Sequence, residues 1–302
     1  PKSLTEAIVG DTLMPLVYIG PAEGAPRNEW RLKSPAELLE LKICDPAMGS
    51  GAFLVQACRW LSERLLEAWS HVEAAGKSVS VEGVVLSVEI SKELLPIDSE
   101  ERTIIARRLI AERCRYGVDI NPLAVELAKL SMWLITLAKG RPFGFLDHNL
   151  RCGDSLLGIH RLDQLTELSL RPTSKGQLRL FGQNIERVVG EAIELRQQLR
   201  ELPIRDIRDV EAMARLDFEA CRKLEMPGCI ADAFIGEVFA LGGNGSILEN
   251  ALITLTIQAG QAIDGDRDVL SLMRRRSIAA LSTDLPDKNP RMPFHWPLEF
   301  PE

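Results

Sequence analysis

The chain has 302 residues, of which 46% are hydrophobic and 26% charged, a composition typical of a globular protein with one large domain or two modest ones. Its net charge is −7 and neither half is basic, which argues against a domain that grips DNA by its own charge. No apolar run approaches the roughly 18 residues of a membrane span and no signal peptide is recognisable, so the sequence predicts a cytoplasmic protein without a membrane partner.

The first part of the chain predicts a helix, a loop and a strand. Residues 4–18 carry an apolar stripe typical of a helix. Residues 19–34 are rich in Pro, Gly and charged residues and predict a loop. Residues 35–39 predict a short helical turn that leads into a strand over residues 41–45.

This strand ends in an acidic residue and continues into a loop with alternate glycines and a long amphipathic helix that ends near residue 75. In a parallel α/β sheet, such a turn forms a nucleotide-sized pocket at the carboxyl end of the first strand. Glycines let the backbone turn sharply and approach a ligand closely. The predicted cofactor contacts of this region are Asp45, Pro46, Ala47, Met48, Gly49, Ser50, Gly51 and Phe53.

The spacing of the glycines favours one class of ligand. A dinucleotide site has the pattern G-x-G-x-x-G and an acid about 20 positions further on, but here the third glycine is absent and the next strand-end acid is Asp119. A phosphate-binding P-loop has Lys and Ser or Thr after its last glycine, where this chain has Ala52 and Phe53. A carboxylate at Asp45 would repel phosphate and attract a cation. S-adenosylmethionine, which carries a sulfonium, an ammonium and no phosphate, therefore fits best.

The next elements predict two further strands. Residues 76–98 hold a β-branched stretch broken at Gly83, which predicts a hairpin or an irregular arm, and a helix opens at Ser99. Residues 116–120 form the second predicted strand, and a helix over about 122–138 follows. Because that helix is apolar on most faces, we expect it to lie between the sheet and another layer. Residues 150–154 form the third predicted strand.

Strands that alternate with helices predict a parallel sheet in an α/β fold. Three strand ends then bring Asp45, Asp119 and Asp154 to one edge of the sheet, where such sheets bind ligands. Asp45 is expected to face the cationic methionine part of the ligand, Asp119 to accept hydrogen bonds from both ribose hydroxyls, and Asp154 to accept one from the adenine amino group. Ile120 and Leu156 are expected to sandwich the adenine ring, and Ser155 is a further predicted cofactor-binding residue.

Residues 161–285 predict helices over about 183–201, 206–226, 230–241, 247–262 and 267–281, and residues 286–302, rich in proline, predict an extended segment. The dense basic run at residues 274–276 is interpreted as a solvated helix face more readily than as a phosphate contact. Six cysteines without C-x-x-C spacing and four histidines without ligand spacing predict free thiols, most of them buried, and no metal site.

Taken together, these motifs resemble the cofactor-binding part of bacterial N6-adenine DNA methyltransferases, in particular the large enzymes of restriction-modification and phage-defence systems. The resemblance covers residues 1–160 and 290–302. It rests on residues 45–54, 116–122 with 124–128, 145–147 and 152–158, on residues 1–5 as the end of an upstream element, and on residues 294–302 as the segment that precedes the catalytic strand.

The resemblance implies a Rossmann-like methyltransferase fold in residues 1–160, a mostly helical insertion in residues 161–285 and a segment over residues 286–302 that leads to the catalytic strand. It implies methyl transfer from S-adenosylmethionine to N6 of adenine in DNA. DNA would be contacted mainly by a region beyond residue 302, and other subunits of a defence system would be further partners.

One departure from the family limits this interpretation. Members of the family catalyse with Asn or Asp, then Pro-Pro, then an aromatic residue, and this sequence contains no Pro-Pro. We therefore name no catalytic residue and expect the chain to be an inactive amino-terminal fragment of a larger enzyme. Two alternatives stay open: a non-catalytic binding or scaffold subunit of a defence complex, and a methyltransferase that acts on RNA or protein. A nicotinamide oxidoreductase fails on the glycine spacing.

Overall fold

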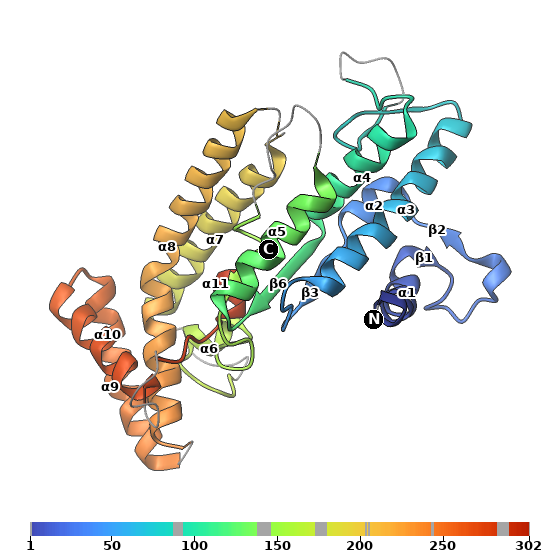
Figure 1. Ribbon diagram of the computed structural model, residues 1–302. Helices are drawn as coiled ribbons and strands as arrows, with labels where there is room; N and C mark the ends of the chain where they lie inside the picture. The colour runs from blue at the N-terminus through green and yellow to red at the C-terminus, as the bar shows by residue number, and fades with distance from the viewer. Residues whose placement is uncertain are drawn as a thin grey trace. The chain divides into compact units, whose positions relative to one another are not determined.

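Strands and helices alternate in the first half of the chain, and helices dominate the second (Figure 1). The computed structural model describes residues 2–86, 93–137, 146–172, 180–202, 204, 206–242, 245–282 and 290–301. They form two units, of which unit 1 comprises residues 1–151 and 202–212, and unit 2 comprises residues 152–201 and 213–302. None of the described helices combines the length and the apolar character needed to cross a membrane.

The sheet of unit 1 contains the three strands that the sequence predicts. They are β3 (Ile43–Asp45), β6 (Arg115–Asp119) and β7 (Leu150–Cys152), in the order β3-β6-β7, with β7 reaching the boundary of unit 2. β3 pairs with β6 in parallel, and Asp45 lies opposite Gly117. The mixed α/β class and parallel pairing are confirmed. Within the described residues β3 is an edge strand, and its Cys44 is exposed.

Helices α3 (Ala52–Ala74), α4 (Ser99–Arg113) and α5 (Pro122–Thr136) pack against one another, and α1 (Lys2–Val17) packs on α3. The buried face of α3 includes Trp69 and the leucines Leu54, Leu61 and Leu65, and each leucine stabilises the fold by roughly 1.5–3 kcal/mol through burial. The short helix α2 (Pro35–Leu39) begins with a capping box between Ser34 and Glu37. These helices follow the predicted pattern closely.

Several local predictions in unit 1 need correction. The buried side of α1 consists of Val9, Leu13 and Val17, at spacings of four residues, whereas Leu4 and Ile8 of the predicted stripe are exposed. The cap of α4 is Asp98 rather than Ser99, because the Asp98 carboxylate accepts hydrogen bonds from two backbone N–H groups of the first turn.

The predicted loop over residues 19–34 contains two short strands, β1 (Tyr18–Ile19) and β2 (Arg31–Leu32), which pair antiparallel, and a 3-10 turn, η1 (Arg27–Glu29). The predicted hairpin is confirmed in β4 (Ser78–Val79) and β5 (Val85–Leu86), which also pair antiparallel; residues 87–92 lie outside the described residues.

Helix α5 is not sandwiched as its apolar sequence predicts. Its inner side, which includes Val125 and Met132, is buried, but Leu127, Leu130 and Leu134 remain 45–61% exposed. An apolar residue count cannot distinguish a covered helix from one with an apolar solvent face, since exposed leucines are common on protein surfaces.

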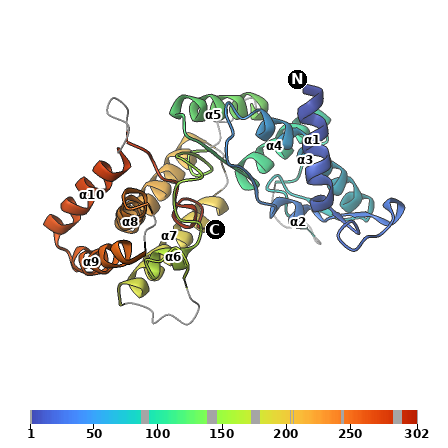
Figure 2. The ribbon, with the colours of Figure 1, turned by 90° about the horizontal axis from the view of Figure 1, so that it is seen from below.

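Unit 2 is helical, as predicted. It contains α6 (Leu162–Thr166), α7 (Leu180–Glu201), most of α8 (Ile207–Ala240), α9 (Gly245–Ile263), α10 (Arg267–Leu281) and α11 (Trp296–Glu299). Figure 2 shows α9 and α10 side by side, in agreement with their contacts. The core of this unit includes Leu165, Ile230, Phe234 and Leu298.

Two predictions about unit 2 are wrong in detail. The helices predicted over 206–226 and 230–241 are one continuous helix, α8, which contains Pro227. Pro227 is buried, so tertiary packing outweighs the tendency of proline to end a helix. The described part of the predicted extended tail includes the short helix α11 and buries Phe294 and Leu298 almost completely. Residues 283–289 lie outside the described residues.

Candidate functional site

The glycine loop of unit 1 is built from backbone contacts to two neighbouring strands. At its start, Oδ1 of Asp45 accepts a hydrogen bond from the N–H of Ala47 (3.1 Å), a local turn that ends β3. The N–H of Met48 donates to the carbonyl of Val118 in β6 (2.9 Å), and the N–H of Gly51 donates to the carbonyl of Met48 (2.9 Å). The Met48 side chain is only 4% exposed, so it anchors the loop to the core.

Glycine is required at positions where the loop, the sheet and α5 approach closely. Gly49 and Gly51 have φ values of +54° and +81°, in the region that L-residues adopt at a cost. A Cβ added at Gly51 would lie 3.1 Å from Cβ and 3.3 Å from Cα of Ala128 in α5. A Cβ at Gly117 would lie 2.3 Å from Sδ of Met48. The loop therefore sits directly on β6, with little space beneath it.

The carboxylate of Asp119 holds this loop in place. Its Oδ2 accepts a hydrogen bond from the N–H of Gly49 (2.8 Å), and its Oδ1 accepts one from the N–H of Asn121 (2.8 Å). The structure thus joins two predicted site residues that are 70 positions apart. Each carboxylate oxygen has a second lone pair, so these two bonds leave Asp119 able to accept further hydrogen bonds.

Several predicted contact residues of unit 1 lie at its surface. Ile120, which follows β6 directly, is 64% exposed, and Phe53 in the first turn of α3 is 40% exposed. Pro46, Ala47 and Ser50 are also exposed. Apolar side chains beside polar, backbone-rich loops are typical of surfaces that bind ligands with an aromatic ring.

Sequence reasoning missed two buried cations beneath the site. Arg115, only 2% exposed, donates through Nη1 to the carbonyl of Leu54 in the first turn of α3 (3.1 Å), and burial lowers the pKa of its guanidinium. Lys129 of α5 donates to Asp147, just before β7 (2.5 Å), and to Glu126 (2.7 Å). Burial opposes the charge of Lys129, but the two carboxylates raise the pKa of its ammonium above the ordinary value. The sequence could have indicated both residues, because each is a charged residue within an otherwise apolar strand or helix.

In unit 2, the structure describes the loop with the remaining predicted residues. Oδ1 of Asp154 accepts a hydrogen bond from the N–H of Leu156 (3.1 Å), the same local turn that Asp45 forms. Leu156 is 88% exposed, and the carbonyl of Ser155 accepts a hydrogen bond from Nε1 of Trp296 (3.1 Å). Asp154 also pairs with Pro293 in a parallel bridge. The loop is therefore fastened to the segment over residues 290–301.

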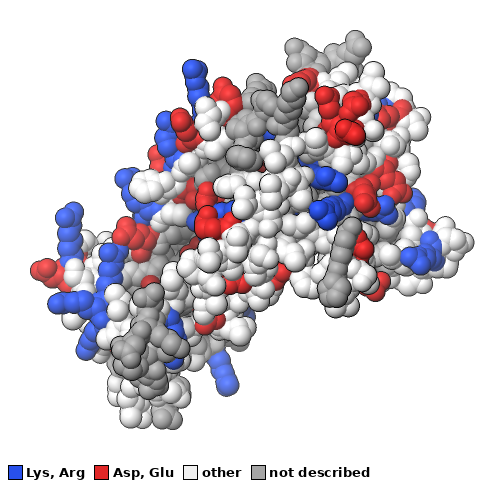
Figure 3. Space-filling model, viewed as in Figure 1, with Lys and Arg blue, Asp and Glu red and all other residues white. Residues whose placement is uncertain are grey.

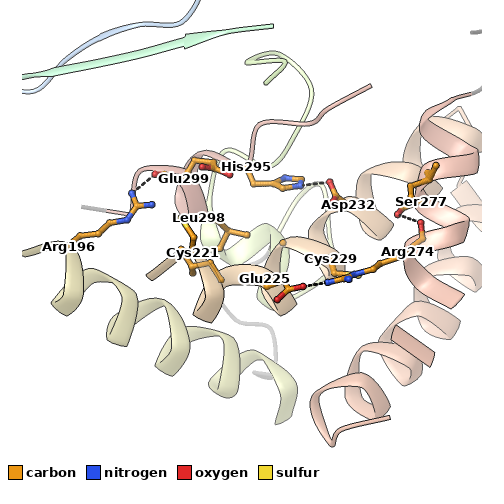
Figure 4. A pocket seen from close by; sticks show the side chains of 13 residues that line it. Arg196, Cys221, Glu225, Cys229, Asp232, Arg274, Ser277, His295, Leu298 and Glu299 are labelled. Carbon is orange, nitrogen blue, oxygen red and sulfur yellow. Dashed lines mark hydrogen bonds and ion pairs between the residues drawn. The ribbon is translucent and has the colours of Figure 1, made fainter. Parts of the chain in front are cut away.

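Unit 2 also contains a cavity of about 400 Å³, shown in Figure 4. Three charged contacts lie around it: His295 with Asp232, Arg274 with Glu225, and Arg196 with the carbonyl of Glu299. Arg274 belongs to the basic run, and its ion pair with Glu225 raises the pKa of its guanidinium. No group of three or more His, Cys, Asp or Glu side chains suited to a metal ion occurs among the described residues.

Charge is mixed over the visible surface. On the face in Figure 3, basic and acidic side chains are interspersed, and basic ones project most often over the helices of unit 2. Among the described residues of unit 2, Lys223 forms an ion pair with the acidic Glu191 (2.6 Å). Exposed pairs of this kind contribute little to stability, and because their charges offset one another they do not create a strong positive potential that would attract phosphate.

Comparison with known proteins adds one family and one relative. Residues 25–144 match the family described as the DNA-methyltransferase domain of MmeI. The chain is 32% identical over 132 residues to a Methanocaldococcus jannaschii protein named as a type II restriction enzyme and methyltransferase, a match that covers 40% of this chain and 9% of that protein. No solved structure matches significantly. The resemblance to restriction-modification methyltransferases, which the motifs predicted, is confirmed, and the matched residues include the glycine loop and Asp119.

Proposed function

We propose that this chain is the cofactor-binding portion of a DNA methyltransferase that transfers a methyl group from S-adenosylmethionine to N6 of adenine, in restriction-modification or phage defence. The observation that carries the proposal is the bond from the N–H of Gly49 to the Asp119 carboxylate, which fixes a glycine loop against the end of the neighbouring parallel strand. The match of residues 25–144 to a DNA-methyltransferase domain supports it. The proposed fold is Rossmann-like, which is compatible with the sheet order β3-β6-β7.

The preference for S-adenosylmethionine over a pyrophosphate ligand rests on charge. Asp45 and Asp119 both lie at the ends of strands that flank the loop, and the residues after Gly51 are Ala52 and Phe53 rather than a lysine. A pyrophosphate there would meet two carboxylates, and the loop has no lysine after Gly51 to offset them. A ligand that carries a sulfonium and an ammonium is attracted by the same carboxylates.

Each proposed contact has a defined task. Asp45, whose Oδ1 is engaged by Ala47, would face the cationic methionine part with Oδ2. The two carboxylate oxygens of Asp119 already accept hydrogen bonds from the N–H groups of Gly49 and Asn121. Each oxygen has a second lone pair, with which it would accept a hydrogen bond from a ribose hydroxyl. Asp154 would accept from the adenine amino group, and Ile120 and Leu156 would cover the ring.

The bound S-adenosylmethionine would supply an activated methyl group on sulfur. The residues of this chain would bind and orient it, and catalysis would depend on proximity to an adenine extruded from the DNA. The catalytic Asn-Pro-Pro-aromatic motif of the resembled family and most DNA contacts would come from outside residues 1–302. Other subunits of a defence system are proposed as further partners.

Calorimetry with four ligands tests this proposal. The chain is expected to bind S-adenosylmethionine and S-adenosylhomocysteine, and to bind NADH and ATP at least about tenfold more weakly, because the latter two carry phosphates. Tight binding of NADH alone would contradict the proposal.

A second assay distinguishes the enzyme from a scaffold. The chain is mixed with the polypeptide encoded downstream of it, and methylation is measured with DNA, RNA and protein as acceptors. N6-methyladenine formed in DNA supports the proposal. Methylation of RNA or protein instead, or cofactor binding without any methylation, would favour one of the two alternatives.

A further inference from the structure

We propose that residues 290–301, here called the strap, position the Asp154 loop for recognition of the adenine ring, and that His295 is the positioning residue within it. This inference rests on the proposed function, because it assumes that Asp154 faces the adenine of S-adenosylmethionine. It adds a role for a segment that the sequence predicted only as a linker to another strand.

The strap and the Asp154 loop are joined through their backbones. The N–H of Asp154 donates to the carbonyl of Met292 (2.7 Å), and the N–H of Phe294 donates to the carbonyls of Leu157 (2.7 Å) and Asp154 (3.2 Å). The N–H of Trp296 donates to the carbonyl of Ile159 (3.0 Å). Through these bonds the strap fixes the backbone of residue 154 and of the turn that follows it.

A glycine makes this close approach possible. A Cβ added at Gly158, whose φ is +150°, would lie 2.2 Å from the backbone oxygen of Phe294 and 2.7 Å from its carbonyl carbon. Phe294 is only 1% exposed and contacts Trp296 and Phe300 edge to face. These ring contacts order the strap itself, and because Phe294 is buried, moving the strap aside would expose its ring to water.

His295 connects the strap to both the loop and the helical core of unit 2. Its Nδ1 accepts a hydrogen bond from the N–H of Ile159 (3.4 Å), so the proton of the neutral ring is on Nε2, which donates to Oδ1 of Asp232 in α8 (3.1 Å). Figure 4 shows the His295 ring directed at Asp232. The side chain of His295 is 7% exposed, so water competes little for the bond to Ile159, whereas the Asp232 carboxylate is 41% exposed and is partly solvated.

The same strap is held at its far end by Arg196. This buried side chain of α7 donates through Nη1 to the carbonyl of Glu299. Three elements of unit 2 thus determine where the strap lies: α7 through Arg196, α8 through Asp232 and the loop after Asp154 through Ile159.

The consequence concerns one oxygen atom. Oδ1 of Asp154 is engaged by Leu156, and no donor among the described residues reaches Oδ2. The direction of Oδ2 is set by the backbone at residue 154, which the strap fixes. If the strap is displaced, Oδ2 no longer points where the adenine amino group would lie.

The test compares the affinities of the chain for two ligands that differ at position 6 of the purine ring. The full chain is titrated with S-adenosylhomocysteine and with S-inosylhomocysteine, in which an oxygen replaces the 6-amino group. The unaltered chain should prefer the adenosyl ligand by about tenfold or more, the effect of a hydrogen bond to a charged acceptor. In Gly158→Ala and in His295→Ala this preference should fall below about threefold, while binding of the inosyl ligand changes little.

Matched variants separate this role from a general loss of stability. Gly265 also has a positive φ (+102°) but nothing within 4 Å of its added Cβ, and His160 is exposed. Gly265→Ala and His160→Ala should keep the full preference. If Gly158→Ala does not fold, His295→Ala, which removes the side-chain bonds of the strap to Ile159 and Asp232 and adds no atoms, decides the question.

The possible failures are distinguishable. An unaltered chain that binds neither ligand would refute the proposed function itself. The unaltered chain could prefer the adenosyl ligand while His295→Ala and Gly158→Ala show the same preference. That result would overturn the role of the strap and leave the proposed function standing.

Discussion

The substitution Asp119→Ala is expected to weaken binding of S-adenosylhomocysteine by about tenfold or more. The carboxylate accepts hydrogen bonds from the N–H groups of Gly49 and Asn121, both at 2.8 Å. Hydrogen bonds to a charged group contribute roughly 1.5–3 kcal/mol each, and about 1.4 kcal/mol lost from binding is already tenfold in affinity. The variant would lose both the fixed position of the glycine loop and the proposed ribose contact. Calorimetry at a temperature where both proteins are folded measures the change.

Asp98 provides a matched control for this experiment. Its carboxylate also accepts two backbone N–H bonds, from Glu100 and Glu101, but at the start of α4, away from the glycine loop in the sequence and in its contacts. Asp98→Ala should lower the free energy of unfolding by about 1 kcal/mol, the usual effect of removing a cap, and leave the affinity unchanged. Equal affinities of the Asp119→Ala variant and the unaltered chain would remove Asp119 from the site.

The substitution Gly51→Ala is expected to destabilise the chain by about 2–4 kcal/mol. The left-handed backbone conformation contributes roughly 1–2 kcal/mol, and overpacking against the backbone of Ala128 contributes the rest. Because Ala128 lies in α5 and its Cα is involved, a side-chain rotation cannot relieve the contact. Urea unfolding, monitored by circular dichroism, gives the free energy of unfolding.

The substitution Gly49→Ala distinguishes the contribution of backbone conformation from that of overpacking. Its φ is also positive, but an added Cβ would have nothing within 4 Å. Gly49→Ala should therefore destabilise the chain only by the conformational part, roughly 1–2 kcal/mol. If both variants lost the same stability, the close approach of the loop to α5 would play no part in the requirement for glycine at position 51.

The sequence predicted the glycine loop and its surroundings well because their signals are local. A β-branched or apolar run, an acid, alternate glycines and an amphipathic helix follow one another within residues 41–75, and each has a direct backbone consequence. The cap of α5 by Asn121 and Pro122 was predictable for the same reason. The structure adds that strand-end aspartates turn the chain, since Asp45, Asp119 and Asp154 each accept from the N–H two residues further on.

The strap and the continuity of α8 were not predictable in this way. His295 and Ile159 are 136 positions apart, and nothing in either local sequence indicates that they are hydrogen-bonded. Five prolines between residues 285 and 302 indicated an extended tail, but buried aromatic contacts of Phe294 decide its structure. Pro227 and Arg115 were unpredictable for the same reason. A proline inside a helix and a buried arginine are tolerated here only because of their tertiary contacts in the folded chain.

A crystal structure of the chain grown with S-adenosylhomocysteine would show whether the glycine loop binds this cofactor. We expect the ligand against the glycine loop, with its ribose hydroxyls within hydrogen-bond distance of the Asp119 carboxylate while the N–H of Gly49 stays bonded to the same group. A loop that remains empty at saturating ligand, or a ligand bound elsewhere in the chain, would contradict it.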